Sequence, residues 1–491
     1  MGKNTIGHGD PAGWIRRPGM LFSSLIFLLL FLPVFFLCYH TAKKRRARNA
    51  LLFVFSLLFY AWGEPVYVLL MLLSLGVNYA LALLISGENK AGGSRRSRSW
   101  LVAACLFNLL LIGVFKYSGF LAGAVNLIPA VNLPVPELPL PIGISFYTFQ
   151  ILSYVIDVYR GDVEALRNPV TLGAYLCAFP QLIAGPIVRY RDIEAELADR
   201  NETAENTAEG MRRFLAGLAK KVLIANVMAQ TADALFASDP AEYGMAGAWI
   251  AALAYTLQIY YDFSGYSDMA IGLGRMMGFH YAENFRYPYA ARSVTDFWRR
   301  WHISLSSFFR DYVYIPLGGN RVSTLKWIRN IAVVWLLTGL WHGAGWNYVL
   351  WGAYYGLLLI LERLVWSKLA DIPVLNRITA LAAVVFGWVM FRSEGFGQMS
   401  AMFAALFGAY GFAGSGGRLP ILLQGAHFDL GFLAAFVCGC VLSAPIWPAV
   451  KKKFASGKLG VIRDTAAILA LAACILALAV GSYNPFIYFR F

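Results

Sequence analysis

Two histidines lie in stretches of this chain that are otherwise aromatic and aliphatic. His302 belongs to the segment DFWRRWHISLSSFFRDYVYIP, which also carries Arg299, Arg300 and Arg310. His342 belongs to WLLTGLWHGAGWNYVLWG, in which glycines flank the histidine. A neutral imidazole can act as a general base near pH 7, or it can donate a hydrogen bond to a backbone carbonyl. His342 is therefore a candidate for proton transfer and for a structural role.

The composition indicates the medium in which these side chains work. The 491 residues are 59% hydrophobic and 14% charged, whereas about a quarter of a soluble globular chain is charged. Apolar runs of helical length recur between residues 21 and 482. Backbone polar groups must be paired inside lipid, so these runs predict helices. We expect an all-α, polytopic integral membrane protein with about eleven transmembrane helices plus re-entrant or interfacial helices.

The apolar surroundings make His342 a candidate functional residue. A titratable side chain inside a bilayer is costly, and it commonly faces a wet cavity or a partner and marks a functional site. The neighbouring Gly339, Gly343 and Gly345 allow another backbone or a ligand to approach closely. By position alone, the catalytic and the structural interpretation of His342 remain equally open.

The net charge of +15 reflects basic clusters beside the apolar runs. The clusters consist of Lys43, Lys44, Arg45, Arg46, Arg48, Arg95, Arg96, Arg98, Lys451, Lys452 and Lys453. This is the positive-inside pattern, so we expect these loops in the cytoplasm and no nucleic-acid partner. Arg16 and Arg17 favour the opposite orientation, but the denser clusters outweigh them.

The segment around His302 has the pattern of an amphipathic helix. Ser293 and Asp296 fit a capping box, so a helix should begin there. One face of this predicted helix carries Phe297, Trp301, Leu305, Phe308 and Tyr312. Such a helix can anchor to lipid headgroups at the interface, or it can fold back into the protein. Both possibilities remain open at this stage.

Three carboxylates lie in similarly apolar surroundings, at Asp157, Asp262 and Asp268. We expect each to pair with an arginine such as Arg160 or Arg275, because buried charges need partners. Such pairs are more often architectural than catalytic.

All six cysteines lie in apolar runs. They are Cys38, Cys105, Cys177, Cys438, Cys440 and Cys474. We expect buried thiols that behave as small hydrophobic side chains, with no disulfide framework and no metal site.

Several long motifs resemble the membrane-bound O-acyltransferase family. They read PIGISFYTFQILSYVIDVYRG, YYDFSGYSDMAIGLGRMMGF, NFRYPYAARSVTDFWRRWHISLSSFFRDYVYIPLGGNR, GLWHGAGWNYVLWGAYYG and NPFIYFRF. Within the family, the chain is most similar to the bacterial branch of alginate and peptidoglycan O-acetylation. The resemblance covers residues 20–491 as a single transmembrane domain with its catalytic core at about 140–367, and residues 1–19 form an N-terminal extension.

This resemblance implies roles for the two histidines. His342 matches the family's catalytic base, in a central tunnel through the protein. His302 matches the second histidine of the family and helps to bind or orient the acyl donor or acceptor. The continuation PLGGNR favours acetyl transfer over D-alanyl transfer.

The resemblance also implies substrates and partners. The donor is a cytoplasmic thioester, acetyl-CoA, with Arg299, Arg300 and Arg310 as candidates to contact its phosphates; arginines at such positions also commonly bind lipid headgroups. No metal is expected. The acceptor is an extracytoplasmic hydroxyl, so we expect a partner acetyltransferase of the SGNH type outside a bacterial inner membrane. The final acceptor would be a cell-surface polysaccharide such as alginate or peptidoglycan.

Two alternatives remain open. A D-alanyl transferase acting on teichoic acid would use a carrier protein as donor. A proton-coupled secondary transporter would also be polytopic, with Asp and His inside the membrane. The chain contains no pair of similar halves with matched broken helices, which disfavours the transporter.

Overall fold

The computed structural model confirms the all-α prediction. It describes residues 20–366, 372–446, 457–481 and 483–487, and these residues form helices, turns and loops but no strand. The predicted extension at 1–19 and the lysines at 451–453 lie outside the described residues. Contacts divide the chain into two compact units, residues 1–209 with 273–281 and residues 210–272 with 282–491.

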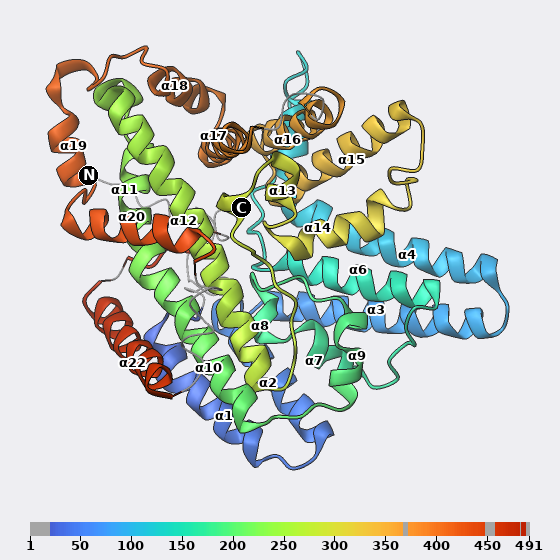
Figure 1. The fold of residues 1–491 in the computed structure, drawn as a ribbon. Coiled ribbons are helices and arrows are strands. Elements are labelled where there is room, and N and C mark those ends of the chain that lie inside the picture. Colours follow the sequence, from blue (N-terminus) through green and yellow to red (C-terminus); the bar gives the residue numbers. More distant parts are fainter. Residues whose placement is uncertain (1–19, 367–371, 447–456, 482, 488–491) are drawn as a thin grey trace. The chain divides into compact units, whose positions relative to one another are not determined.

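The first unit contains a helical hairpin. α3 packs against α4, and both contact α6 (Figure 1). The helices of this unit are α1 (Leu32–Thr41), α2 (Arg45–Gly63), α3 (Tyr67–Lys90), α4 (Ser94–Ile112), α5 (Ser118–Val125), α6 (Ile144–Arg160), α7 (Pro169–Leu176), α8 (Phe179–Leu182) and α9 (Tyr190–Ala198). The proline-rich connection at 129–141 is not helical, as its prolines predict.

The second unit contains both histidines. α10 (Ala204–Ala219) leads into it, and α12 is bent at Gly244. Its further helices are α11 (Asn226–Ala237), α12 (Pro240–Met276), α13 (Val294–Trp298), α14 (Ile303–Phe309), α15 (Thr324–His342), α16 (Trp346–Leu364), α17 (Pro373–Arg392), α18 (Phe396–Leu406), α19 (Leu419–Gly425), α20 (Leu430–Ser443) and α22 (Gly457–Val480).

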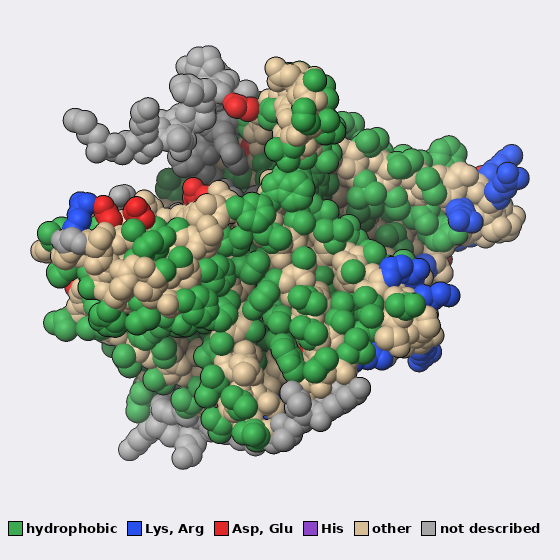
Figure 2. Space-filling view, turned by 90° about the horizontal axis from the view of Figure 1, so that it is seen from above, with side chains coloured by type: hydrophobic (Ala, Val, Ile, Leu, Met, Phe, Trp, Pro, Cys, Tyr) green, Lys and Arg blue, Asp and Glu red, His purple; other side chains and the backbone are tan. Residues whose placement is uncertain are grey.

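Four described helices are long and apolar enough to cross a bilayer. They are Tyr67–Lys90, Ser94–Val125, Pro373–Arg392 and Gly460–Val480, and the bent pair α19 and α20 forms a fifth if it counts as one span. The predicted number of about eleven is therefore not confirmed. Two further apolar helices, Phe27–Thr41 and Phe396–Leu406, are shorter. Apolar side chains cover much of the face shown in Figure 2, as expected for a protein surrounded by lipid.

The basic cluster before α2 has a structural role in the first unit. Glu202 accepts hydrogen bonds from Arg45 and Arg48, and its side chain is buried. Burial raises the pKa of Glu202, but the bonds from the two arginines lower it further, so the pKa lies below its ordinary value. A charged Glu202 therefore holds these arginines in place.

The cysteine prediction is wrong for two positions. Cys438 and Cys440 are exposed on the apolar helix α20, whereas Cys177 and Cys474 are buried. The difference arises because α20 packs only part of its surface within its unit. An apolar run can be surrounded by lipid without being buried in protein.

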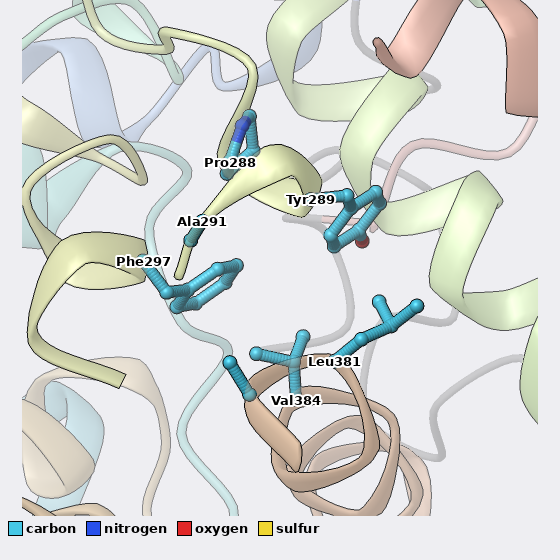
Figure 3. A pocket seen from close by; sticks show the side chains of 7 residues that line it. Pro288, Tyr289, Ala291, Phe297, Leu381 and Val384 are labelled. Atoms are coloured by element: carbon cyan, nitrogen blue, oxygen red, sulfur yellow. The ribbon is translucent and has the colours of Figure 1, made fainter. Parts of the chain in front are cut away.

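α13 packs directly against α17 in the second unit. Figure 3 shows Phe297 of α13 and Tyr289 facing Leu381 and Val384 of α17. The gap between them has no room for a water molecule. This contact is tight packing rather than a ligand site, and it fixes the beginning of the segment that carries His302.

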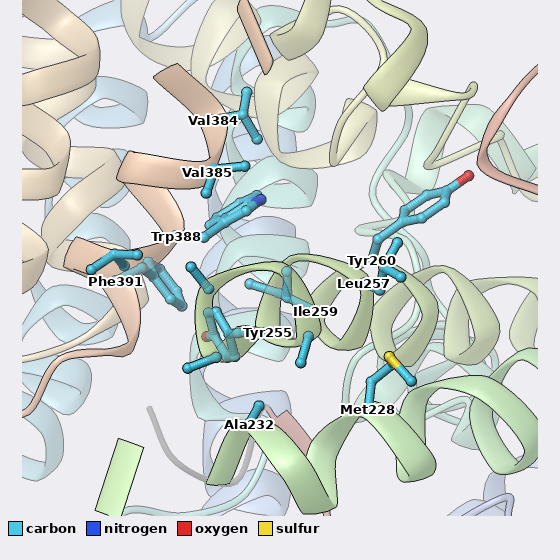
Figure 4. Close-up of a cluster of buried hydrophobic side chains, with 14 of the residues drawn as sticks. Met228, Ala232, Tyr255, Leu257, Ile259, Tyr260, Val384, Val385, Trp388 and Phe391 are labelled. Atoms are coloured by element: carbon cyan, nitrogen blue, oxygen red, sulfur yellow. The ribbon is translucent and has the colours of Figure 1, made fainter. Parts of the chain in front are cut away.

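The core of the second unit joins α11, α12 and α17. Figure 4 shows Tyr255 and Ile259 of α12 beside Trp388 and Phe391 of α17. The indole of Trp388 is 1% exposed. These large, rigid side chains pack closely, so they keep the neighbouring elements in a defined position.

Two glycines let α15 and α16 pack at close range. A Cβ added at Gly339 would lie 2.3 Å from the carbonyl oxygen of Tyr348, and one at Gly352 would lie 2.4 Å from that of Trp335. The backbones therefore touch directly. The hairpin holds His342 at the end of α15, as the glycine-rich sequence predicts.

Gly339→Ala should accordingly destabilise the protein by about 1–3 kcal/mol, because the methyl group must push two backbones apart. The measurement is the thermal midpoint of the detergent-purified protein. Gly397→Ala is the matched control, because no atom lies within 4 Å of the added Cβ in helix α18. That variant should be as stable as the parent or more so. Equal stability of both variants would contradict the close packing.

Candidate active site

The predicted start of the helix before His302 is confirmed. The Ser293 hydroxyl accepts a hydrogen bond from the backbone N–H of Asp296 at 3.1 Å, and it is the N-cap of α13. The Asp296 carboxylate accepts from the N–H of Arg292 at 3.0 Å and from the guanidinium of Arg300 at 2.8 Å. Burial raises the pKa of Asp296, but these two bonds lower it further, so the carboxylate is charged at neutral pH.

Glu362 of α16 binds the same helix end. Its carboxylate accepts from the backbone N–H of Val294 at 2.7 Å and of Thr295 at 3.2 Å. A carboxylate at a helix N-terminus pairs with otherwise unsatisfied N–H groups and with the helix dipole. α13 and α16 are therefore tied together beside the site.

The prediction of one continuous helix from Ser293 to Tyr312 is wrong. α13 ends at Trp298, and α14 begins only at Ile303. His302 stands between them with φ of 45°, in the left-handed region. The predicted apolar face is nevertheless buried: Phe297, Trp301, Leu305 and Phe308 are all at most 4% exposed. The segment folds back into the protein instead of lying on the lipid surface.

Two backbone hydrogen bonds hold the break open. The N–H of Ile303 donates to the carbonyl of Asn284 at 3.0 Å, and the N–H of Arg286 donates to the carbonyl of Arg300 at 2.9 Å. A left-handed residue other than glycine costs about 1–2 kcal/mol, so surrounding contacts must maintain it. Such strain commonly occurs where a side chain must be aimed at a functional site.

His302 is buried among polar and aromatic groups. Its Nδ1 lies 3.2 Å from Oδ1 of Asn284, and its ring meets the ring of Phe263 edge to face at 4.6 Å between centroids. Burial lowers the pKa of His302 below its ordinary value. The imidazole is therefore neutral at neutral pH.

His342 is the last residue of α15 and lies near His302. The centroids of the two imidazoles are 6.5 Å apart, and Trp341 contacts both rings. Trp351 and Phe391 pack edge to face on His342 at 5.1 and 5.2 Å. The fold thus brings the two candidate histidines together inside an aromatic cluster.

A cavity of about 420 Å³ adjoins His302. Its walls come from α13, α14, α15 and the end of α16, and they include Trp298, Trp327 and Trp335. His302 is 1% exposed, whereas Arg299 and Arg310, which also line the cavity, are exposed. The imidazole therefore lies at the buried end, and the guanidinium groups lie where the cavity opens. This volume is typical of a ligand site.

His342 lines a different and much smaller space. A cavity of about 10 Å³ borders His342, Ile259, Trp301 and Ile487. It holds about one water molecule. His342 is not among the residues that line the larger cavity. Of the two candidate histidines, His302 is therefore the one that borders the large cavity.

The three predicted arginines differ in their positions. Arg299 and Arg310 line the large cavity, and Arg310 also pairs with Asp311 at 2.7 Å. Arg300 is bound to Asp296 and is not among the lining residues. Arg363, which the sequence analysis did not single out, lines the cavity and lies over the ring of Trp327 at 4.2 Å. No sequence signal separates Arg363 from the other arginines at helix ends.

The buried carboxylates are paired as predicted, but with other partners. Asp262 pairs with Lys221 at 2.7 Å. Asp268 pairs with Arg213 and Lys220, both at 2.6 Å, and Arg275 pairs with Glu209 instead. In the first unit, Asp157 lies 3.7 Å from Arg191. These ion pairs join helices and do not touch the histidines. Among the described residues, no group of three or more His, Cys, Asp or Glu could hold a metal ion.

Comparison with known proteins identifies the family of this chain. The model of the membrane-bound O-acyltransferase family matches residues 165–396, which include both histidines. A protein of Azotobacter vinelandii named "Probable alginate O-acetylase AlgI" is 41% identical over 96% of this chain and 100% of its own length. The "Peptidoglycan O-acetyltransferase" of Helicobacter pylori is 33% identical over 96% of this chain and 98% of its own. The "Teichoic acid D-alanyltransferase" of Bacillus subtilis is 28% identical over 60% and 86%.

This chain therefore belongs to the membrane-bound O-acyltransferase family. It is an O-acyltransferase and a multi-pass membrane protein, and its similarity to the two acetyl-transferring relatives exceeds that to the D-alanyl transferase. The transporter alternative has no support among these relatives.

The left-handed conformation of His302 makes a prediction about stability. Both His302→Gly and His302→Ala remove the imidazole ring. The two variants therefore differ mainly in how readily residue 302 adopts a positive φ. Gly should be more stable than Ala by about 1 kcal/mol, because glycine adopts positive φ without strain. The thermal midpoints of the two variants in detergent measure this difference.

Ser307, within helix α14, is the matched position. There the order should be reversed, because glycine is the poorer residue in a helix by about 1 kcal/mol. If His302→Ala is as stable as His302→Gly, the claim that the backbone at position 302 is strained would be contradicted.

Proposed function

We propose that this protein moves an acetyl group from a cytoplasmic thioester, acetyl-CoA, to an extracytoplasmic hydroxyl for O-acetylation of a cell-surface polysaccharide. The observation that carries the proposal is the cavity of about 420 Å³ with His302 at its buried end and arginines at its opening. It suits a long donor with an anionic head and a narrow arm. The names of the relatives from Azotobacter vinelandii and Helicobacter pylori support an acetyl group and a polysaccharide such as alginate or peptidoglycan.

In the proposed reaction, the acceptor hydroxyl attacks the thioester carbonyl. A C–O bond forms and the C–S bond breaks, so the thiolate of coenzyme A leaves. His342 takes the proton of the hydroxyl and returns it to the leaving thiolate. His302, 6.5 Å away between ring centroids, binds or orients a reacting group at the end of the cavity. Because the surroundings are apolar, hydrogen bonds in the site are stronger than in water.

The arginines at the cavity opening are proposed to bind the donor's phosphates. Arg299, Arg310 and Arg363 line the cavity and are exposed, so they can reach an anionic head outside it. Arginine donates paired hydrogen bonds that match phosphate oxygens. Arg300 is held by Asp296, and we propose that it adds positive charge without direct contact.

The proposal includes a membrane arrangement. The chain would cross a bacterial inner membrane about eleven times, as one domain over residues 20–491 with its core at about 140–367 and with a central tunnel joining the two sides. α15 and α16 are not among the four most apolar long helices, yet with 19 residues each they are long enough to cross. A partner acetyltransferase of the SGNH type would receive the acetyl group outside the membrane and pass it to the polysaccharide.

Purified protein incubated with acetyl-CoA and an acceptor hydroxyl should release coenzyme A and form an acetyl ester. His342→Ala should lower kcat at least about a hundredfold, which is the usual contribution of a general base. Release of free thiol and mass spectrometry of the acceptor measure the two products. Acetyl transfer that persists unchanged in a folded His342→Ala variant would contradict the assigned base. A donor preference for D-alanyl carrier protein would contradict the acetyl proposal.

The phosphate contacts can be tested with two donors. Arg299→Ala should raise KM for acetyl-CoA about fivefold, corresponding to about 1 kcal/mol for an exposed charge pair. The KM for acetyl-pantetheine, which lacks the phosphates, should not change. Arg292→Ala is the matched control, because Arg292 is exposed beside the same helix but does not line the cavity. An equal rise for both donors would exclude phosphate binding by Arg299.

A further inference from the structure

The amide of Asn284 is the centre of a buried hydrogen-bond network in the second unit. Its Oδ1 lies 3.2 Å from Nδ1 of His302, 3.2 Å from the backbone nitrogen of Ser304 and 3.0 Å from the Ser304 hydroxyl. Its Nδ2 donates to the Ser267 hydroxyl at 3.1 Å. Asn284 is 1% exposed. The network links the loop before α13, the core helix α12 and the start of α14.

The backbone of Ser304 decides which way the amide faces. A backbone N–H can only donate, so the Asn284 atom beside it must be the oxygen. The same oxygen faces Nδ1 of His302. If Nδ1 carried a lone pair, two acceptors would oppose each other at 3.2 Å. The Ser304 hydroxyl cannot resolve such a conflict well, because it lies 3.5 Å from Nδ1 but 3.0 Å from the amide oxygen. Nδ1 of His302 must therefore be protonated.

A neutral imidazole with a proton on Nδ1 has its lone pair on Nε2. Nε2 of His302 is buried and has no hydrogen-bond partner among the described residues. His302 lines the large cavity, whereas Asn284, which occupies the Nδ1 side of the ring, does not. Because Asn284 occupies Nδ1, a group that reaches Nε2 from the cavity meets an acceptor and not a donor.

We propose that Asn284 is a positioning residue that fixes His302 in the Nδ1–H tautomer, so that Nε2 accepts a hydrogen bond from the bound substrate. This inference deepens the proposed function and rests on it for the identity of the substrate. The group that binds at Nε2 must be a donor, either the acceptor hydroxyl or an amide N–H of the pantetheine arm. A carbonyl oxygen or an oxyanion does not fit, because it would face a lone pair.

Several charged or titratable groups lie on the elements around His302. His342 on α15 lies 6.5 Å away between ring centroids, and Arg299, Arg310 and Arg363 border the same cavity. The carboxylates adjacent in sequence to the residues of the network are Glu283 and Asp268, and both are paired with Arg213. α12 contributes Phe263 to the ring contact. A carboxylate introduced at position 284 would therefore be the negative charge nearest to the ring, and its effect on the pKa of His302 can be measured.

The first test reads the tautomer directly and needs no activity. Nitrogen-15 spectra of protein labelled at histidine should contain one ring in the Nδ1–H form, whose signals vanish in His302→Gln. In Asn284→Leu, which keeps the volume but removes the acceptor, this ring should lose its preference for the Nδ1–H form. A His302 signal from the Nε2–H tautomer in the unchanged protein would overturn the proposal.

The second test uses the pH titration of the His302 nitrogen-15 signals, because the acidic limb of acetyl transfer reports the proposed base, His342. Asn284→Asp keeps the acceptor for Nδ1–H but adds a negative charge, which stabilises the imidazolium and raises its pKa. The His302 titration should therefore move to higher pH. Ser304→Ala is the control: it keeps the His302–Asn284 bond and should leave the His302 titration where it is.

Double substitution separates positioning from general stabilisation. With His302→Gln already present, Asn284→Leu should reduce the remaining activity no further, because its effect acts through the ring. A further reduction of equal size, or a His302 titration unmoved by Asn284→Asp, would overturn the positioning role. If the unchanged protein shows the Nδ1–H tautomer but transfers no acetyl group, the proposed function fails while the assignment of Asn284 stands.

Discussion

The site depends on the hydrogen bonds that join the loop at Asn284–Arg286 to the turn at Arg300–Ser304. Two backbone bonds and the Asn284 side chain hold His302 in a left-handed conformation between two short helices. Without them, a continuous helix would have the lower free energy, because a left-handed residue costs about 1–2 kcal/mol. A continuous helix would rotate the imidazole away from its present direction. The network therefore determines which nitrogen of the ring meets the cavity.

Rigid aromatic packing stabilises the positions of the two imidazole rings. Trp341 contacts both imidazoles, and Trp351 and Phe391 pack on His342. Large side chains with few rotatable bonds lose little conformational entropy when they are ordered, and they exclude water from the rings. Neutral histidines are favoured in such surroundings, since burial disfavours the charged form. The apolar composition that suits the chain to lipid thus also favours the neutral form of the buried His302.

Local patterns in the sequence were reliable where neighbouring residues decide the outcome. The N-cap at Ser293 and the close approach at Gly339 depend on spacing along the chain, and both were correctly predicted. Spacing also predicted the apolar face through Trp301, but whether that face meets lipid or protein was left open, and the fold buries it in protein. The break at His302 was missed because bonds from Asn284 and Arg286, distant in the sequence, impose it. The hydrogen bonds of Asn284 to the His302 segment could not be predicted for the same reason.

The ion pairs and cavity residues illustrate the same limit. The need of Asp268 for a cation follows from burial, but its choice of Arg213 and Lys220 depends on how α10 meets α12. Arg363 lies in the sequence next to an ordinary helix end, and it joins the cavity because Glu362 ties α16 to α13. The type of interaction could be predicted, whereas its partners required the fold.

The two separate cavities suit an enzyme that must pass an acyl group without opening the membrane. A tunnel open to water along its whole length would let ions cross, so the proposed tunnel must be closed where donor and acceptor meet. His302 borders the large cavity, and His342 borders a separate space for about one water molecule. The two rings are 6.5 Å apart between centroids, and Trp341 contacts both of them. In the proposed reaction, the acetyl group would therefore need to move only a short distance, while the charged donor stays on its own side.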